Sequence, residues 1–138
     1  MNAEELYPLV SEAIRRAETL DDLGAPGAAT AFLDVSLLEE KIAEALPATD
    51  PEGSLARRGA VRAALSAREF GRARQLVERY LAEEGTPPEL CGDLRELEQQ
   101  ADRASAARFP HVSERYGLVA IRYLAQAFVH QQAPFPIA

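Results

Sequence analysis

Residues 63–81, AALSAREFGRARQLVERYL, carry the clearest indication of a helical fold. Their polar centre, residues 66–69, matches a capping box, in which a serine and a glutamate three residues later close the start of a helix. Apolar residues then recur at helical spacing: Phe70, Ala73, Val77, Tyr80 and Leu81. We therefore predict one helix that ends near Leu65 and a second that runs from this box to Gly85.

Similar capping and turn residues divide the rest of the chain into further helices. Asn2 and Glu5 form another capping box, Asp50 precedes a first-turn proline, and Thr86 is expected to cap the next helix. The predicted helices cover about residues 2–23, 28–46, 51–65, 66–84, 87–107 and 112–132. Because no segment shows the two-residue alternation of a strand, the sequence predicts a single all-α domain over residues 1–138, with six amphipathic helices.

The loops between these helices are short, and short loops join antiparallel neighbours in helical proteins. The helices therefore pair into three hairpins, at about residues 2–46, 51–84 and 87–132. Each hairpin has the length of a helical repeat.

The middle hairpin, over about residues 54–88, resembles a tetratricopeptide repeat. The residues that carry the resemblance follow the turn and lie near the expected repeat end: Phe70, Ala73, Val77, and Pro87 or Pro88. The tryptophan and Leu-Gly positions of that family's first helix are not matched. The resemblance implies an open array of helical hairpins, and a closed six-helix bundle remains the alternative.

Composition and charge exclude several classes of protein. The chain is 47% hydrophobic and 27% charged, as in ordinary globular domains, and its net charge of -7 argues against nucleic-acid binding. The lone Cys91 cannot form an internal disulfide, and no signal peptide or membrane-spanning run is recognisable. We expect a protein of a bacterial-type cytoplasm that makes no membrane contact.

Known catalytic and metal-binding patterns are not found. His111 and His130 lack the spacing of di-iron or zinc ligands, and no phosphate-binding loop is present. Cys91 falls in the first turns of a helix, where the dipole favours a thiolate, but Glu89 and Asp93 oppose that charge. The sequence favours a protein without metal, cofactor or enzymatic activity.

Charge is unevenly distributed along the chain. Residues 1–53 have a net charge of -9 and residues 82–138 a net charge of -3, whereas residues 54–81 carry seven arginines against two glutamates. The middle hairpin is therefore basic between acidic neighbours. Arginine presents a planar fork that suits carboxylates and phosphates.

Two interpretations of these arginines are open. In the tetratricopeptide family the first helix of each hairpin lines a groove, so the resemblance implies that Arg57, Arg58 and Arg62 bind an acidic partner there. Arginines on the second helix would lie outside the groove: Arg68, Arg72 and Arg79. In the second interpretation the arginines pair internally, with acidic residues of the second helix or with the fifth helix; the second-helix candidates are Glu39, Glu40 and Glu44.

The leading hypothesis is a non-enzymatic interaction module that binds a peptide or a partner protein. The alternatives are a homodimeric bundle that associates through the apolar last helix, and a helical protein that binds a small ligand. The tail, residues 133–138, contains Phe135 and Ile137 and is expected to pack in extended form on the helices or on a second subunit.

Overall fold

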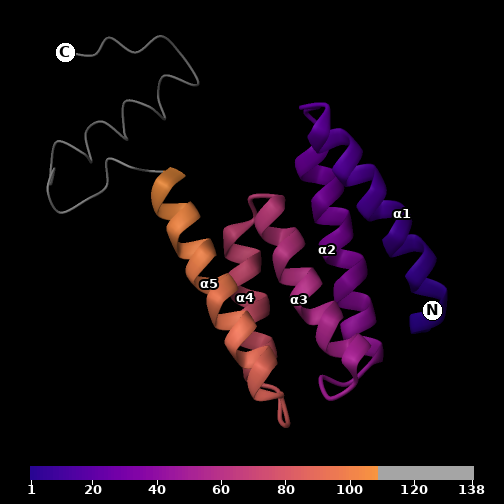
Figure 1. Ribbon diagram of the computed structural model, residues 1–138, viewed down its shortest axis with the longest axis vertical. Helices are drawn as coiled ribbons and strands as arrows, with labels where there is room; N and C mark the ends of the chain where they lie inside the picture. Colours follow the sequence, from indigo (N-terminus) through magenta and orange to yellow (C-terminus); the bar gives the residue numbers. More distant parts are fainter. Residues whose placement is uncertain (109–138) are drawn as a thin grey trace, which may run out of the picture. The chain divides into compact units, whose positions relative to one another are not determined.

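The computed structural model describes residues 1–108, and every regular element in this part of the chain is a helix. The helices are α1 (Ala3–Asp22), α2 (Ala28–Ala45), α3 (Pro51–Ser66), α4 (Phe70–Leu81) and α5 (Pro88–Arg108) (Figure 1). The prediction of an all-α chain is confirmed over these residues. The predictions that lie outside them concern His111, His130, the sixth helix at 112–132 and the tail at 133–138.

Two helix starts follow directly from the sequence. At α1 the Asn2 side chain accepts a hydrogen bond from the Glu5 amide at 2.9 Å, and the Glu5 carboxylate accepts one from the Asn2 amide at 3.3 Å. At α3 the Asp50 carboxylate accepts from the Glu52 amide at 2.8 Å, with Pro51 as the first helical residue. Both predicted caps are confirmed, because each is satisfied by residues within one turn.

The predicted capping box at residues 66–69 is wrong. Ser66 is the last residue of α3 instead of the cap of α4, and α4 begins only at Phe70. Glu69 precedes α4 without a side-chain capping bond. Residues 66–69 therefore end one helix and do not start the next.

The end of α3 explains this difference. The Glu69 amide donates to the Ala64 carbonyl and the Arg68 amide donates to the Leu65 carbonyl, both at 2.9 Å, which together form a Schellman motif. Arg68 has a φ of 61°, in the left-handed region that glycine usually occupies in this motif. Residues 66–69 contain no glycine, so nothing in them indicates a helix end of this kind.

Thr86 also differs from its predicted role. The helix after it starts at Pro88, so Thr86 lies one residue too early to be its cap. Its hydroxyl lies within hydrogen-bonding distance of the Glu83 carbonyl at 2.8 Å and of the Tyr80 carbonyl at 3.1 Å. Thr86 therefore closes the end of α4.

Successive helices pack on one another in chain order. Helix α1 contacts α2, α2 contacts α3 and α3 contacts α4, and α1 to α3 lie side by side in Figure 1. Apart from Arg57, the buried residues of α3 are small: Gly53, Ala56, Ala60, Val61, Ala63 and Ala64. Small side chains let neighbouring backbones approach, and the Ser36 hydroxyl of α2 accordingly donates to the Ala60 carbonyl at 2.6 Å.

Residues Met1–Ala101 form a compact unit. Helix α5 contributes to its core through four residues at helical spacing: Leu90, Leu94, Leu97 and Ala101. None of the helices within residues 1–108 is long and apolar enough to span a membrane.

Candidate functional site

The three arginines predicted to bind a partner lie in different environments on α3. Arg57 is buried, with 4% of its surface exposed, whereas Arg58 is partly exposed and Arg62 is exposed. Only Arg58 and Arg62 have surface that a partner can reach, so the three arginines do not form one binding cluster.

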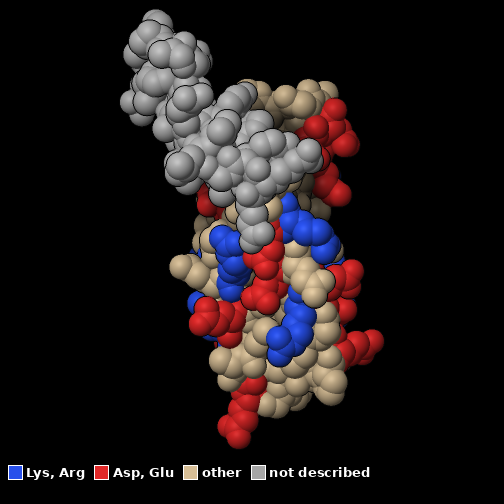
Figure 2. Space-filling model, turned by 90° about the vertical axis from the view of Figure 1, so that its left-hand side faces the viewer, with Lys and Arg blue, Asp and Glu red and all other residues tan. Residues whose placement is uncertain are grey.

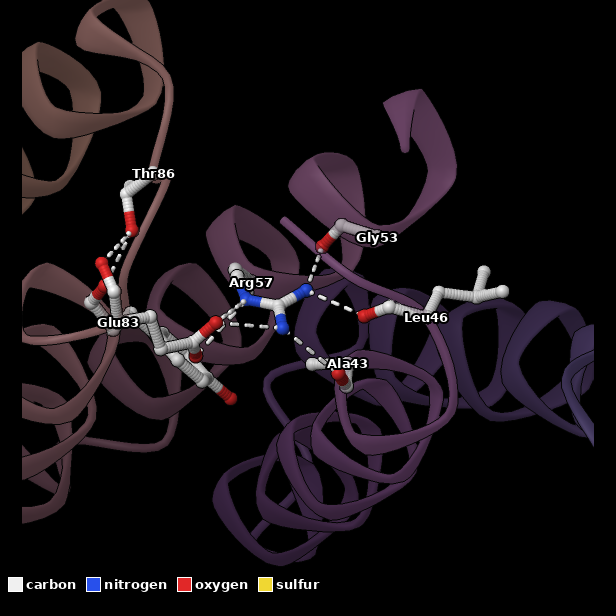
Figure 3. A network of polar contacts seen from close by, with 7 residues as sticks. Ala43, Leu46, Gly53, Arg57, Glu83 and Thr86 are labelled. Atoms are coloured by element: carbon white, nitrogen blue, oxygen red, sulfur yellow. Dashed lines mark hydrogen bonds and ion pairs between the residues drawn. The ribbon is translucent and has the colours of Figure 1, made fainter. Parts of the chain in front are cut away.

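Arg57 makes hydrogen bonds through all of its guanidinium nitrogens (Figure 3). Nε and Nη2 hold the Glu83 carboxylate at 3.1 Å and 2.9 Å. Nη1 donates to the carbonyls of Leu46 and Gly53 at 3.0 Å and 2.9 Å, and Nη2 donates to that of Ala43 at 3.0 Å.

A guanidinium group has five N–H donors, and these contacts occupy all of them. The carbonyls belong to the end of α2 and the start of α3, and Glu83 follows α4, so Arg57 ties three helices together. Its guanidinium carbon also lies 5.5 Å from the centre of the Tyr80 ring. Arg57 thus has a structural role, with no donor left for a ligand.

Arg58 and Arg62 line a small hollow of about 180 Å³ between α3 and α5. Asp93 and Glu96 of α5 line the same hollow. Arg58 pairs with Asp93 at 3.1 Å, and no ion pair of Arg62 is found within residues 1–108. The hollow therefore has a balanced charge.

On α4, Arg72 and Arg79 both bind Glu40 of α2. The Arg72 pair has an N–O distance of 2.7 Å, and Arg72 Nε also donates to the Ser36 hydroxyl at 3.0 Å. Burial acts to raise the pKa of Glu40, but the hydrogen bonds from Arg79 and Arg72 outweigh it and hold the pKa below its ordinary value. This cluster joins the first hairpin to the second.

Several arginines of the basic segment are thus paired with carboxylates inside the unit, among them Arg57, Arg58, Arg72 and Arg79. Figure 2 agrees, since basic and acidic side chains are intermingled on the face that it shows. Many of the arginines in the basic segment therefore form ion pairs that hold the helices together.

A larger groove of about 580 Å³ lies between α1 and α3, over α2. Its apolar lining includes Ile14 of α1, Phe32 and Val35 of α2, and Leu55 of α3. Leu55 is 53% exposed and Ile14 is 36% exposed. Large apolar side chains that remain exposed around a concave surface are typical of a binding site.

Glu39 of α2 also lines this groove. Its carboxylate lies against Gly59 of α3, so closely that a methyl group at Gly59 would come within 2.8 Å of it. No hydrogen bond or ion pair of this carboxylate is found within the described residues, and Glu39 thus does not pair with the arginines there. Burial, together with the nearby charge of Glu52, raises the pKa of Glu39 to about 7.

The sequence did not indicate this groove. Gly59 lies inside a helical pattern without ending it, and such a glycine often marks a close contact with another element. Leu55 is an apolar residue on the otherwise polar face of its helix. Neither observation identifies Glu39, because Glu39 and Gly59 belong to different hairpins. Arg62 was predicted, and the structure places it in the groove as well as in the hollow beside Arg58.

No cluster of three or more metal-ligating side chains is present among residues 1–108. Cys91 is partly buried, and its Sγ lies 3.9 Å from the Thr86 carbonyl oxygen. Comparison with protein-family models, curated proteins and solved structures found no match to this chain. The groove between α1 and α3 is therefore assigned on its geometry alone.

Proposed function

We propose that this protein is a non-enzymatic interaction module, which binds a segment of a partner protein in the groove formed by α1, α2 and α3. The observation that carries the proposal is the groove itself, with Leu55 and Ile14 exposed on opposite walls. The groove has the volume of a binding site, and its exposed walls leave it open to a chain that enters from solvent. The proposed setting is the bacterial-type cytoplasm expected from the sequence.

The proposed arrangement is an open, tetratricopeptide-like array. In such an array the first helices of successive hairpins border one continuous face. Two features support it: α1 and α3 border the large groove, and α3 and α5 border the smaller hollow. Arg62 lines both, and no residue of α4 lines either, whereas α2 forms the floor of the large groove through Phe32, Val35 and Glu39.

Of the three arginines predicted to bind a partner, we retain Arg62 and omit Arg57 and Arg58. Arg62 is exposed and lines both the groove and the small hollow. Arg58 also lines the small hollow, where it pairs with Asp93. Arg57 is excluded because its donors are all used within the chain.

A library of random short peptides displayed on phage tests the proposal without knowledge of the natural partner. The protein is expected to enrich a family of peptides that binds the wild type and fails to bind Leu55→Glu, because a carboxylate on the groove wall disfavours an apolar contact. The matched control is Leu23→Glu, since Leu23 is 75% exposed and lies outside the groove.

Circular dichroism melting of both variants confirms that they are folded. Binding that is lost in Leu55→Glu and retained in Leu23→Glu supports the groove. A library without enriched peptides, or peptides that bind both variants equally, contradicts the proposed function.

A further inference from the structure

The groove between α1 and α3 is acidic. Glu18, Asp21 and Asp22 line its α1 wall and Glu39 lies on its floor, whereas Arg62 lines the α3 wall. The acidic side chains outnumber the basic ones around it, in contrast to the balanced hollow beside Arg58 and Asp93. Charge complementarity therefore favours a cationic occupant.

Glu39 is the carboxylate best placed to contact that occupant. It is partly buried, it lines the groove, and the part of the chain that the structure describes gives it no hydrogen-bonding partner. Gly59 leaves the space that its carboxylate fills. A partly desolvated carboxylate without a partner interacts more strongly with an incoming cation than an exposed one does.

The walls beside Glu39 are apolar. Ile14 and Leu55 expose aliphatic surface to the same groove. Lysine and arginine have an aliphatic stem and a charged end, so they pack the stem on apolar surface while the end reaches a polar group. Their chemistry matches a groove that has aliphatic walls and a carboxylate on its floor.

We infer that the groove recognises a basic, amphipathic segment of a partner protein, with a lysine or arginine that binds Glu39 and packs its stem against Ile14 and Leu55. This inference rests on the proposed function and names the partner's chemistry. It replaces the acidic partner expected from the sequence, because Arg57 and Arg58 already bind Glu83 and Asp93.

The test uses the peptides that the phage library enriches, synthesised with a fluorescent label and titrated with the full chain. They are expected to contain lysine or arginine beside apolar residues. Glu39→Gln is expected to weaken their binding about tenfold, as the loss of one charge-assisted contact does. The matched control, Glu44→Gln, removes the same charge from an exposed position of α2 outside the groove and is expected to leave binding unchanged.

A charge exchange completes the test. A peptide whose basic residue is replaced by glutamate is expected to lose binding to the wild type and to regain it with Glu39→Lys. Enriched peptides that are acidic and depend on Arg62, or basic peptides that are insensitive to Glu39→Gln, overturn the inference. Such peptides still support the proposed function if Leu55→Glu abolishes their binding, so the two failures are distinguishable.

Discussion

Arg57 and Glu39 are both charged side chains held between α2 and α3, yet their surroundings are opposite. Every donor of Arg57 has an acceptor, supplied by Glu83 and three backbone carbonyls. Glu39 lies on the groove floor, and residues 1–108 provide its carboxylate with no donor. Arg57 lies where three helices meet, and Glu39 lies where two helices leave a space.

The difference separates structural charges from those available for binding. A buried charge is stable when its hydrogen bonds compensate for the lost solvation, as they do at Arg57. A partly buried carboxyl without that compensation has a raised pKa, because burial favours its neutral form, as at Glu39. Burial alone therefore does not distinguish a structural charge from one that is available for binding. The number of hydrogen-bonding partners within the chain does.

The largest effect is expected from Arg57→Met, which keeps an aliphatic side chain and removes the donors. Glu83 and the carbonyls of α2 and α3 lose their partner, and the free energy of unfolding is expected to fall by about 3 kcal/mol. Urea denaturation measures it, with Arg16→Met on the exposed face of α1 as the control. A fall of less than about 1 kcal/mol, near the ordinary effect of surface substitutions, contradicts the structural role.

Gly53 lies in the Arg57 network, and its environment is equally tight. A methyl group there would lie 2.1 Å from the Pro47 carbonyl oxygen, a backbone atom that cannot move without shifting the loop before α3. Gly53→Ala is expected to destabilise the protein by about 2 kcal/mol, in spite of the higher helix propensity of alanine. Thermal melting checks this, and an unchanged or raised Tm shows that the loop adapts.

Glu39→Gln is expected to change the pH dependence of stability. Because the pKa of Glu39 is raised to about 7, the folded chain keeps a proton that the unfolded chain releases near pH 4.5, so this group lowers stability as the pH rises between these values. Glu52 adds to the shift, and the other charged groups around the groove include Glu18 and Arg62.

Glutamine stays neutral throughout this range. The variant is expected to be more stable than the wild type at pH 8 by on the order of 1 kcal/mol, a figure that allows for solvent screening of the partly exposed carboxyl. Urea denaturation at pH 5 and pH 8 measures the difference. If the two proteins lose stability in parallel as the pH rises, Glu39 is not the group responsible.

The smallest effect is expected from Gly59→Ala on the groove side of α3. The new methyl group would meet only the end of the Glu39 side chain, which is free to rotate away. Alanine is therefore expected to raise the free energy of unfolding by about 0.5 kcal/mol through helix propensity. Opposite signs for Gly53→Ala and Gly59→Ala would confirm the comparison, whereas equal destabilisation would show that Glu39 is as fixed as Arg57.

Local interactions explain which features of the fold were predictable. The capping residues Asn2 and Asp50 bond to amides within three residues, so their roles can be recognised in the sequence. The capping box predicted at residues 66–69 was wrong because the same four residues can also end a helix when Arg68 adopts a left-handed conformation. Whether these residues start or end a helix depends on how α3 and α4 pack, and a short stretch of sequence carries no information about that packing.

The order of residues alone was enough to predict the helical class, the main helix boundaries within residues 1–108 and the basic character of the middle hairpin. Helical periodicity and capping act over a few residues, and charge is a property of composition. It is the packing of the helices that encloses Arg57, exposes Arg62 and brings Glu39 against Gly59 beside an open groove. Those outcomes depend on which side chains from separate hairpins come together, because partners, and not residue type, determine whether a charge stabilises the fold or remains available to bind.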